Sequence, residues 1–126
     1  MRGFFQMAAQ QNIEIAKAWF NAFNEHNLEN LLALFDENIQ HYSPKLKLRQ
    51  PETNGIANGK AALRAWWQGT FDRTPTLSFK TISITANEER VFMEYVRHAE
   101  NEPDLRGAEV LEIMNGLIIA SRVYHG

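Results

Sequence analysis

The C-terminal stretch "RGAEVLEIMNGLIIASRVYHG", residues 106–126, contains two apolar-rich runs separated by Asn115 and Gly116. Both runs are rich in the Val, Ile and Leu side chains that favour strands. An Asn-Gly pair favours a two-residue turn whose positive φ angles match the twist of the flanking strands. The stretch therefore predicts an antiparallel hairpin.

Two more strands are predicted before this hairpin, over residues 77–85 and 89–99, with a short polar turn between them. In the first of them, "LSFKTISIT", the apolar phase changes between Phe79 and Ile82, which predicts a β-bulge near Lys80. Together the four strands predict an antiparallel meander in the second half of the chain.

The first half of the chain instead has apolar residues at helical spacing. This periodicity predicts helices over residues 11–25, 28–35 and 59–71, and a single strand over 38–43 that ends at Pro44. Asn27 and Asn58 are the predicted N-caps of the second and third helices. Three helices on the concave face of a curved antiparallel sheet make an α+β cone, and such a cone encloses a cavity suited to small molecules.

Length and composition limit the class of protein. The 126 residues predict one domain, assigned to residues 10–126, after a mobile or locally docked leader over residues 1–9. A net charge of −2 argues against a nucleic-acid partner, and no apolar run is long enough for a membrane span or a signal peptide. Without cysteine there is no disulfide or cysteine metal site, and the default expectation is a cytoplasmic location.

The chain resembles the nuclear transport factor 2-like superfamily, specifically its SnoaL-like and ketosteroid-isomerase-like branch. The resemblance is carried by "WFNAFNEHNLENLLALFDENIQHYSP" at residues 19–44, "NGKAALRAWW" at 58–67 and the C-terminal stretch, and it covers residues 11–126. It implies a cone-shaped α+β barrel that forms a homodimer through its open sheet. The superfamily includes isomerases, polyketide cyclases, dehydratases, epoxide hydrolases and non-catalytic binders.

The site of the ketosteroid isomerases is carried over one position at a time. Ser43 stands where those enzymes have a general-base aspartate, and Trp19 where they have an oxyanion-donating tyrosine. Glu109 matches their second acid, and SnoaL-like cyclases also use an acid near this position. Because only Glu109 is kept as an acid, steroid isomerisation by the usual mechanism is disfavoured.

His41 is a candidate proton carrier on the first strand. It shares one face of that strand with Ile39 and Ser43, and the apolar Ile39 indicates that this face points inward. A neutral imidazole exchanges protons near neutral pH. The alternatives are a hydrogen-bonded core histidine and a histidine on the outer face.

Glu109 is a candidate acid on the first strand of the C-terminal hairpin. It shares a face with Leu111, and on an apolar cavity wall burial raises the pKa of a carboxyl, so that its neutral form donates a hydrogen bond to a developing oxyanion. The alternative is an ion pair with Arg97 or Arg122, which lowers the pKa. Both faces of this strand carry apolar residues, so alternation alone leaves its orientation open.

The remaining candidates are Tyr95, as a third catalytic residue, and the substrate-binding residues. Tyr95 and Arg97 share a strand face, where Tyr95 suits a pocket wall and Arg97 can bind a carboxylate or an enolate. The alternative places Arg97 at the solvent rim. Either Trp66 or Trp67 is expected at the pocket mouth or against a partner chain, and Leu111 is taken as part of the apolar wall.

These residues predict a cavity that binds a small, largely apolar organic molecule without a cofactor or a metal. For an enzyme we expect isomerisation, cyclisation or dehydration through an enol-like intermediate. His41 would move the proton, Glu109 or Tyr95 would stabilise the oxygen, and Ser43 would orient the substrate or a water. The alternatives are a non-catalytic ligand-binding or protein-interaction module of the same fold, and an accessory domain that acts through its open sheet.

Overall fold

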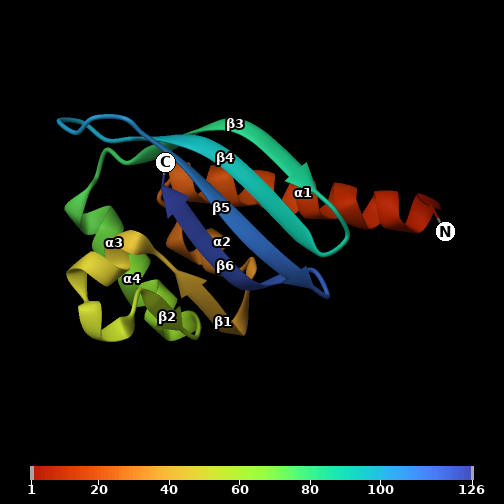
Figure 1. The fold of residues 1–126 in the computed structure, drawn as a ribbon, viewed down its shortest axis with the longest axis horizontal. Coiled ribbons are helices and arrows are strands. Elements are labelled where there is room, and N and C mark those ends of the chain that lie inside the picture. The colour runs from red at the N-terminus through yellow and green to blue at the C-terminus, as the bar shows by residue number, and fades with distance from the viewer. Residues whose placement is uncertain (1, 126) are drawn as a thin grey trace.

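The computed structural model describes residues 2–125, apart from the side chains of Arg2, Phe4 and Phe5. Helix α1 spans Arg2–Asn24, and its first turns extend beyond the sheet (Figure 1). The predicted start at residue 11 was wrong, because residues 2–9 continue the helix. Gln6, Met7, Ala8 and Ala9 have high helix propensity, and no proline interrupts residues 2–9. Residue 1 of the predicted leader lies outside the described residues.

Within the described residues the strands form one curved, six-stranded sheet in the order β2-β1-β6-β5-β4-β3, with β2 and β3 at its open edges (Figure 1). The strands are β1 Phe35–Tyr42, β2 Ile56–Asn58, β3 Ser78–Ala86, β4 Arg90–His98, β5 Leu105–Met114 and β6 Leu117–His125. The predicted meander is formed by β3 to β6. One pairing departs from the antiparallel pattern, since β1 runs parallel to β6.

The predicted hairpin and bulge are both present. Asn115 and Gly116 connect β5 to β6 with φ angles of 53° and 78°, the left-handed conformation that this turn requires. The register between β3 and β4 shifts between Thr81 and Ser83, next to the predicted position at Lys80. A bulge bends and twists its strand, so it contributes to the curvature that makes the sheet concave.

Along the chain, the other helices come between α1 and β3. They are α2 Leu28–Leu32, α3 Pro44–Arg49, the 3-10 helix η1 Pro51–Thr53 and α4 Lys60–Arg73. Asn27 caps α2 as predicted, by accepting a hydrogen bond from the Asn30 N–H, whereas the N-cap of α4 is Gly59 because Asn58 still belongs to β2. Helix α3 was not predicted. Proline was taken as the end of a strand, but it is also a favoured first residue of a helix.

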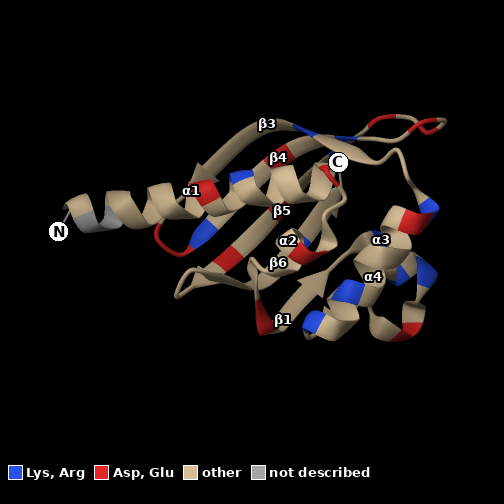
Figure 2. Ribbon diagram, turned by 180° about the vertical axis from the view of Figure 1, so that it is seen from behind, with Lys and Arg blue, Asp and Glu red and all other residues tan. Residues whose placement is uncertain are grey.

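The core lies between the concave face of the sheet and the helices α1, α2 and α4. Its centre is a group of aromatic rings in which Trp19 stacks on Phe23 at 5.0 Å between centroids and Phe79 contacts Tyr95 at 4.4 Å. The helices do not fill the end of the cone near α3 and α4, where the cavity lies. Seen from behind, basic residues gather on these two helices (Figure 2).

Candidate active site in the cone

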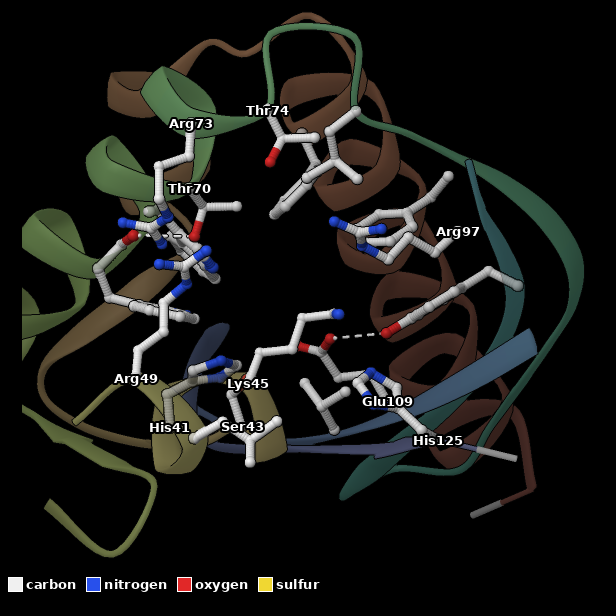
Figure 3. A pocket seen from close by; sticks show the side chains of 18 of the residues that line it. His41, Ser43, Lys45, Arg49, Thr70, Arg73, Thr74, Arg97, Glu109 and His125 are labelled. Carbon is white, nitrogen blue, oxygen red and sulfur yellow. Dashed lines mark hydrogen bonds between the residues drawn. The ribbon is translucent and has the colours of Figure 1, made fainter. Parts of the chain in front are cut away.

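The cavity has a volume of about 330 Å³, and it is lined by α1, α3, α4 and the strands β1 and β3 to β6 (Figure 3). The structure brings seven of the eight predicted site residues to its wall. These are His41, Glu109, Tyr95, Ser43, Trp19, Arg97 and Trp66. This settles which face of β4 and β5 points inward, because Tyr95, Arg97 and Glu109 all face the cavity and are buried.

Glu109 is the deepest acidic group of the cavity, with 2% of its surface exposed. Its Oε1 accepts a hydrogen bond from the Tyr95 hydroxyl at 3.4 Å, and its Oε2 has no hydrogen-bond partner among residues 2–125. Burial raises its pKa to about 8, although the Tyr95 hydrogen bond acts in the opposite direction. The carboxyl is therefore largely neutral at pH 7. The predicted alternative of an ion pair does not occur, because Arg97 pairs with Glu102 and Arg122 with Glu112.

Tyr95 stays protonated for the same physical reason. Burial raises the pKa of its hydroxyl, and the nearby carboxyl of Glu109 adds to this effect through its charge and its hydrogen bond. The Tyr95 ring also stacks near Trp19, with 6.2 Å between centroids. The Trp19 Nε1 is buried and, like Glu109 Oε2, has no hydrogen-bond partner among the described residues. Two residues of the cavity wall thus each contain a buried polar atom without a hydrogen-bond partner among the described residues.

His41 combines the predicted inward position with a hydrogen bond that the sequence did not reveal. Its Nδ1 lies 2.6 Å from the Ser121 Oγ, and its ring is 5.5 Å from Trp67. Burial lowers its pKa to about 4, so the imidazole is neutral at pH 7. Ser121 belongs to β6 and faces His41 through the parallel pairing with β1. Alternation within one strand cannot identify such a partner.

Ser43 has a structural role in addition to its place at the cavity, whereas Leu111 lies outside the cavity wall. The Ser43 Oγ caps α3 by accepting a hydrogen bond from the Leu46 N–H at 3.4 Å, while the residue also lines the cavity. Leu111 is not among the lining residues, so its assignment to the pocket wall was wrong. It lies two residues beyond Glu109 on β5, fully covered by the hydrophobic core.

The aromatic wall is larger than predicted, because Trp66 and Trp67 both line the cavity. Adjacent helical residues point in different directions, but the cavity extends around the inner side of α4 and reaches both rings. Phe23 and Phe79 complete this wall on the side of α1 and β3. The wall offers flat apolar surfaces to the body of a ligand.

Of the basic side chains at the cavity, only Arg97 was predicted from the sequence. Lys45 and Arg49 extend from α3 and Arg73 from α4, and all three point toward the cavity together with Arg97 of β4 (Figure 3). We call Lys45, Arg49, Arg73 and Arg97 the basic rim. The available signal was the spacing of Lys45 and Arg49, which places both on one helix face, but it has meaning only once α3 is recognised.

Two kinds of feature are absent from residues 2–125. Within residues 2–125, no group of three or more His, Asp or Glu side chains is arranged to hold a metal ion. In the same range, no helix combines the length and the apolarity that crossing a membrane requires.

The comparisons with known proteins agree with this architecture. The family model of the SnoaL-like domain matches residues 16–121. A SnoaL-like protein of unknown function from Burkholderia thailandensis has 19% identity and a TM-score of 0.82, with 93% of this chain and 95% of that chain covered. A proposed ketosteroid isomerase from Kribbella flavida has 18% identity and a TM-score of 0.77, with coverage of 94% and 79%.

A third solved structure, TerC co-crystallized with polyporic acid, has 13% identity and a TM-score of 0.79, with 92% of each chain covered. At these identities the likeness to solved structures concerns the fold. No curated protein sequence matches the chain at a significant level.

Proposed function

The chain belongs to the SnoaL-like domain family, and we propose that its cavity binds a small organic molecule with an oxygen hydrogen-bonded to Glu109. The observation that carries this proposal is the buried Glu109 Oε2, which has no hydrogen-bond partner among the described residues. A buried polar atom without a partner costs free energy. A ligand oxygen in the cavity supplies the missing partner.

The protonated carboxyl of Glu109 is suited to a carbonyl or enolate oxygen. Its O–H donates from Oε2, while Oε1 is held by the Tyr95 hydroxyl at 3.4 Å. The Trp19 N–H is a second donor on the same wall. Donors fixed in a water-poor site stabilise negative charge that develops on an oxygen, which is the principle of an oxyanion hole. The aromatic wall packs against the apolar body of the molecule.

As an enzyme, the protein would carry out cofactor-free acid–base chemistry on such a molecule. The neutral imidazole of His41 takes a proton from the carbon beside the carbonyl, and Glu109 stabilises the resulting enolate. His41 then returns this proton. Delivered to another carbon it completes an isomerisation, delivered to a β-hydroxyl group that leaves as water it completes a dehydration, and delivered to the alkoxide formed when the enolate carbon attacks a second carbonyl it completes a cyclisation. Ser43 orients the substrate or a water, because its hydroxyl proton remains free to donate while its oxygen caps α3.

A non-catalytic binding module is the second candidate function, and one observation favours it. A pKa of about 4 makes His41 a weak proton acceptor at neutral pH. The same fold would then hold its ligand through the Glu109 and Trp19 donors without turnover.

The exposed Phe92 and Tyr124 lie on β4 and β6, at positions that alternate with the buried ones. We propose this outer face as the homodimer surface, which light scattering after size-exclusion chromatography tests.

The test of the proposed function uses two variants of Glu109. A panel of aromatic ketones and enols is screened by ligand-induced shifts of the melting temperature, because a ligand that prefers the native state stabilises it. For any hit, we expect Glu109→Gln to keep most of the affinity, since its amide N–H still donates. Glu109→Ala removes the donor and should weaken binding about tenfold, the value of one hydrogen bond of roughly 1.4 kcal/mol.

The control is Glu112→Gln, which changes an acid that pairs with Arg122 outside the cavity. It should leave the affinity unchanged. Equal affinity of the wild type and Glu109→Ala for every hit contradicts the role of Glu109. Turnover of a hit that disappears in His41→Ala identifies an enzyme, and binding without turnover identifies a binding module.

A further inference from the structure

The cavity has an uncompensated positive charge at its mouth. Among the described lining residues the acids are Glu102 and Glu109. Glu102 is paired with Arg97 at 2.9 Å, and Glu109 is largely neutral at pH 7. Within the described part of the chain, no ion pair involves Lys45, Arg49 or Arg73. Three cations of the basic rim therefore face the cavity without an anion of their own.

These cations are close enough to affect one another. Burial is the main cause that lowers the pKa of Lys45, and the charges of Arg97 and Arg49 lower it further, while Glu102 opposes them. Burial and the charge of Arg49 also lower the pKa of Arg73, while the charge of Asp72 on the same helix opposes them. Lys45 is half-buried, whereas Arg49 and Arg73 are exposed. Like charges brought together repel one another, so an anion bound among them relieves the repulsion, and at Lys45 it also compensates for lost hydration.

Arg73 is held at the rim by its neighbours on α4. Its guanidinium lies over the Trp66 ring at 5.2 Å from the centroid. It also lies against Gly69, where an added Cβ would be 2.8 Å from the Arg73 Nη1. A glycine inside a helix is less favourable than an alanine. Here the glycine leaves the space that the guanidinium occupies, so the position of Arg73 is built into the helix.

We infer that the ligand of this cavity is an organic carboxylate, with its carboxylate at the basic rim, its flat apolar body along the aromatic wall, and an uncharged oxygen at Glu109. The guanidinium groups favour a carboxylate because their paired N–H groups match its two oxygens. The inference deepens the proposed function and relies on it for the Glu109 end alone. It also makes the expectation of a largely apolar ligand more specific, because the body of the ligand is apolar and one end is charged.

The test compares two compounds that differ in this charge. The probes are 4-acetylbenzoate and 4-acetylbenzamide, which share an aromatic ring and a ketone. Affinities are measured by isothermal titration calorimetry at low salt. We expect the carboxylate to bind about tenfold more tightly or better, since a charge-assisted hydrogen bond contributes about 1.5–3 kcal/mol. Added sodium chloride should reduce this preference, because salt screens charges at the open mouth.

Variants of the rim assign the preference to its residues. Lys45→Gln, Arg49→Gln and Arg73→Gln should each reduce the affinity for 4-acetylbenzoate and leave that for 4-acetylbenzamide unchanged. The matched control is Lys47→Gln, because Lys47 lies on the same helix, is exposed and does not line the cavity. It should keep the full preference. Circular dichroism confirms that each variant is folded.

The outcomes separate this inference from the proposed function. Equal affinities for the two probes, or a preference that survives all three rim variants, overturn the inference. If the amide also loses affinity in Glu109→Ala, the proposed function stands without it. A carboxylate preference that depends on the rim but not on Glu109 supports the inference and contradicts the proposed function. The inference is also overturned if neither probe shows saturable binding at millimolar concentration. If phenyl phosphate binds more tightly than 4-acetylbenzoate, the carboxylate assignment is wrong and the basic rim binds a phosphate.

Discussion

Replacing Glu109 with glutamine removes a buried ionisable group and keeps a side chain of nearly the same shape. In the wild-type protein burial raises the pKa of Glu109 from 4.5 to about 8. The stability that this group contributes is complete below its unfolded pKa and is lost as the pH rises through the folded value. At about 1.4 kcal/mol per pKa unit, the shift corresponds to a loss of at most about 5 kcal/mol in the free energy of unfolding.

Urea denaturation followed by circular dichroism, at pH values from about 5 to about 9, measures this effect. The free energy of unfolding of the wild type should fall relative to that of Glu109→Gln as the pH rises, by several kcal/mol in total. The control Glu112→Gln, outside the cavity, should keep the wild-type pH dependence. Parallel curves for the wild type and Glu109→Gln would refute a buried neutral acid, whichever of the two is more stable.

Three further predictions concern other residues of the fold and the site. For His41, whose pKa burial lowers from 6.5 to about 4, stability is lost as the pH falls through this range. His41→Gln should abolish this loss of about 3 kcal/mol in acid urea titrations. Leu111→Ala should lower the free energy of unfolding by about 2–5 kcal/mol without changing ligand affinity, because Leu111 lies in the core behind the cavity wall. A loss of affinity without a loss of stability would instead show that Leu111 belongs to the binding site. Gly116→Ala should lower stability by about 1–2 kcal/mol because Gly116 has a φ of 78°, whereas Asn115→Gly should not, and equal stability of both variants would contradict the strain argument.

Local patterns in the sequence were sufficient for much of the fold. The hairpin at Asn115 and Gly116 and the cap at Asn27 depend on neighbouring residues alone, and both were predicted. The inward face of β1 was predicted correctly from the alternation of Ile39, His41 and Ser43, which are all buried. The orientation of Glu109 was not settled by alternation, because apolar residues on both faces of β5 allow either one to be inward.

The parts of the site that were not predicted depend on contacts between distant segments. Ser121 faces His41 only because β6 lies parallel to β1, and no local pattern specifies that register. The basic rim depends on α3, whose six residues are too few to show a helical period. The absence of Leu111 from the cavity wall depends on how far the helices cover the sheet. Side-chain alternation predicts which face a residue occupies but not what covers that face.

The position of β6 in the sheet has a consequence for how the protein is made. In the strand order, β6 lies between β1 and β5 and is the only strand within the described residues that joins the β1–β2 pair to β5, β4 and β3. Among the strands of residues 2–125, it is also the last to be synthesised. The β3–β4–β5 unit can therefore form before β6 is made, but it is joined to β1 only after residues 117–125 have left the ribosome. A nascent chain that stalls before residue 117 would hold two unjoined sheet fragments with exposed edges, a natural substrate for chaperones.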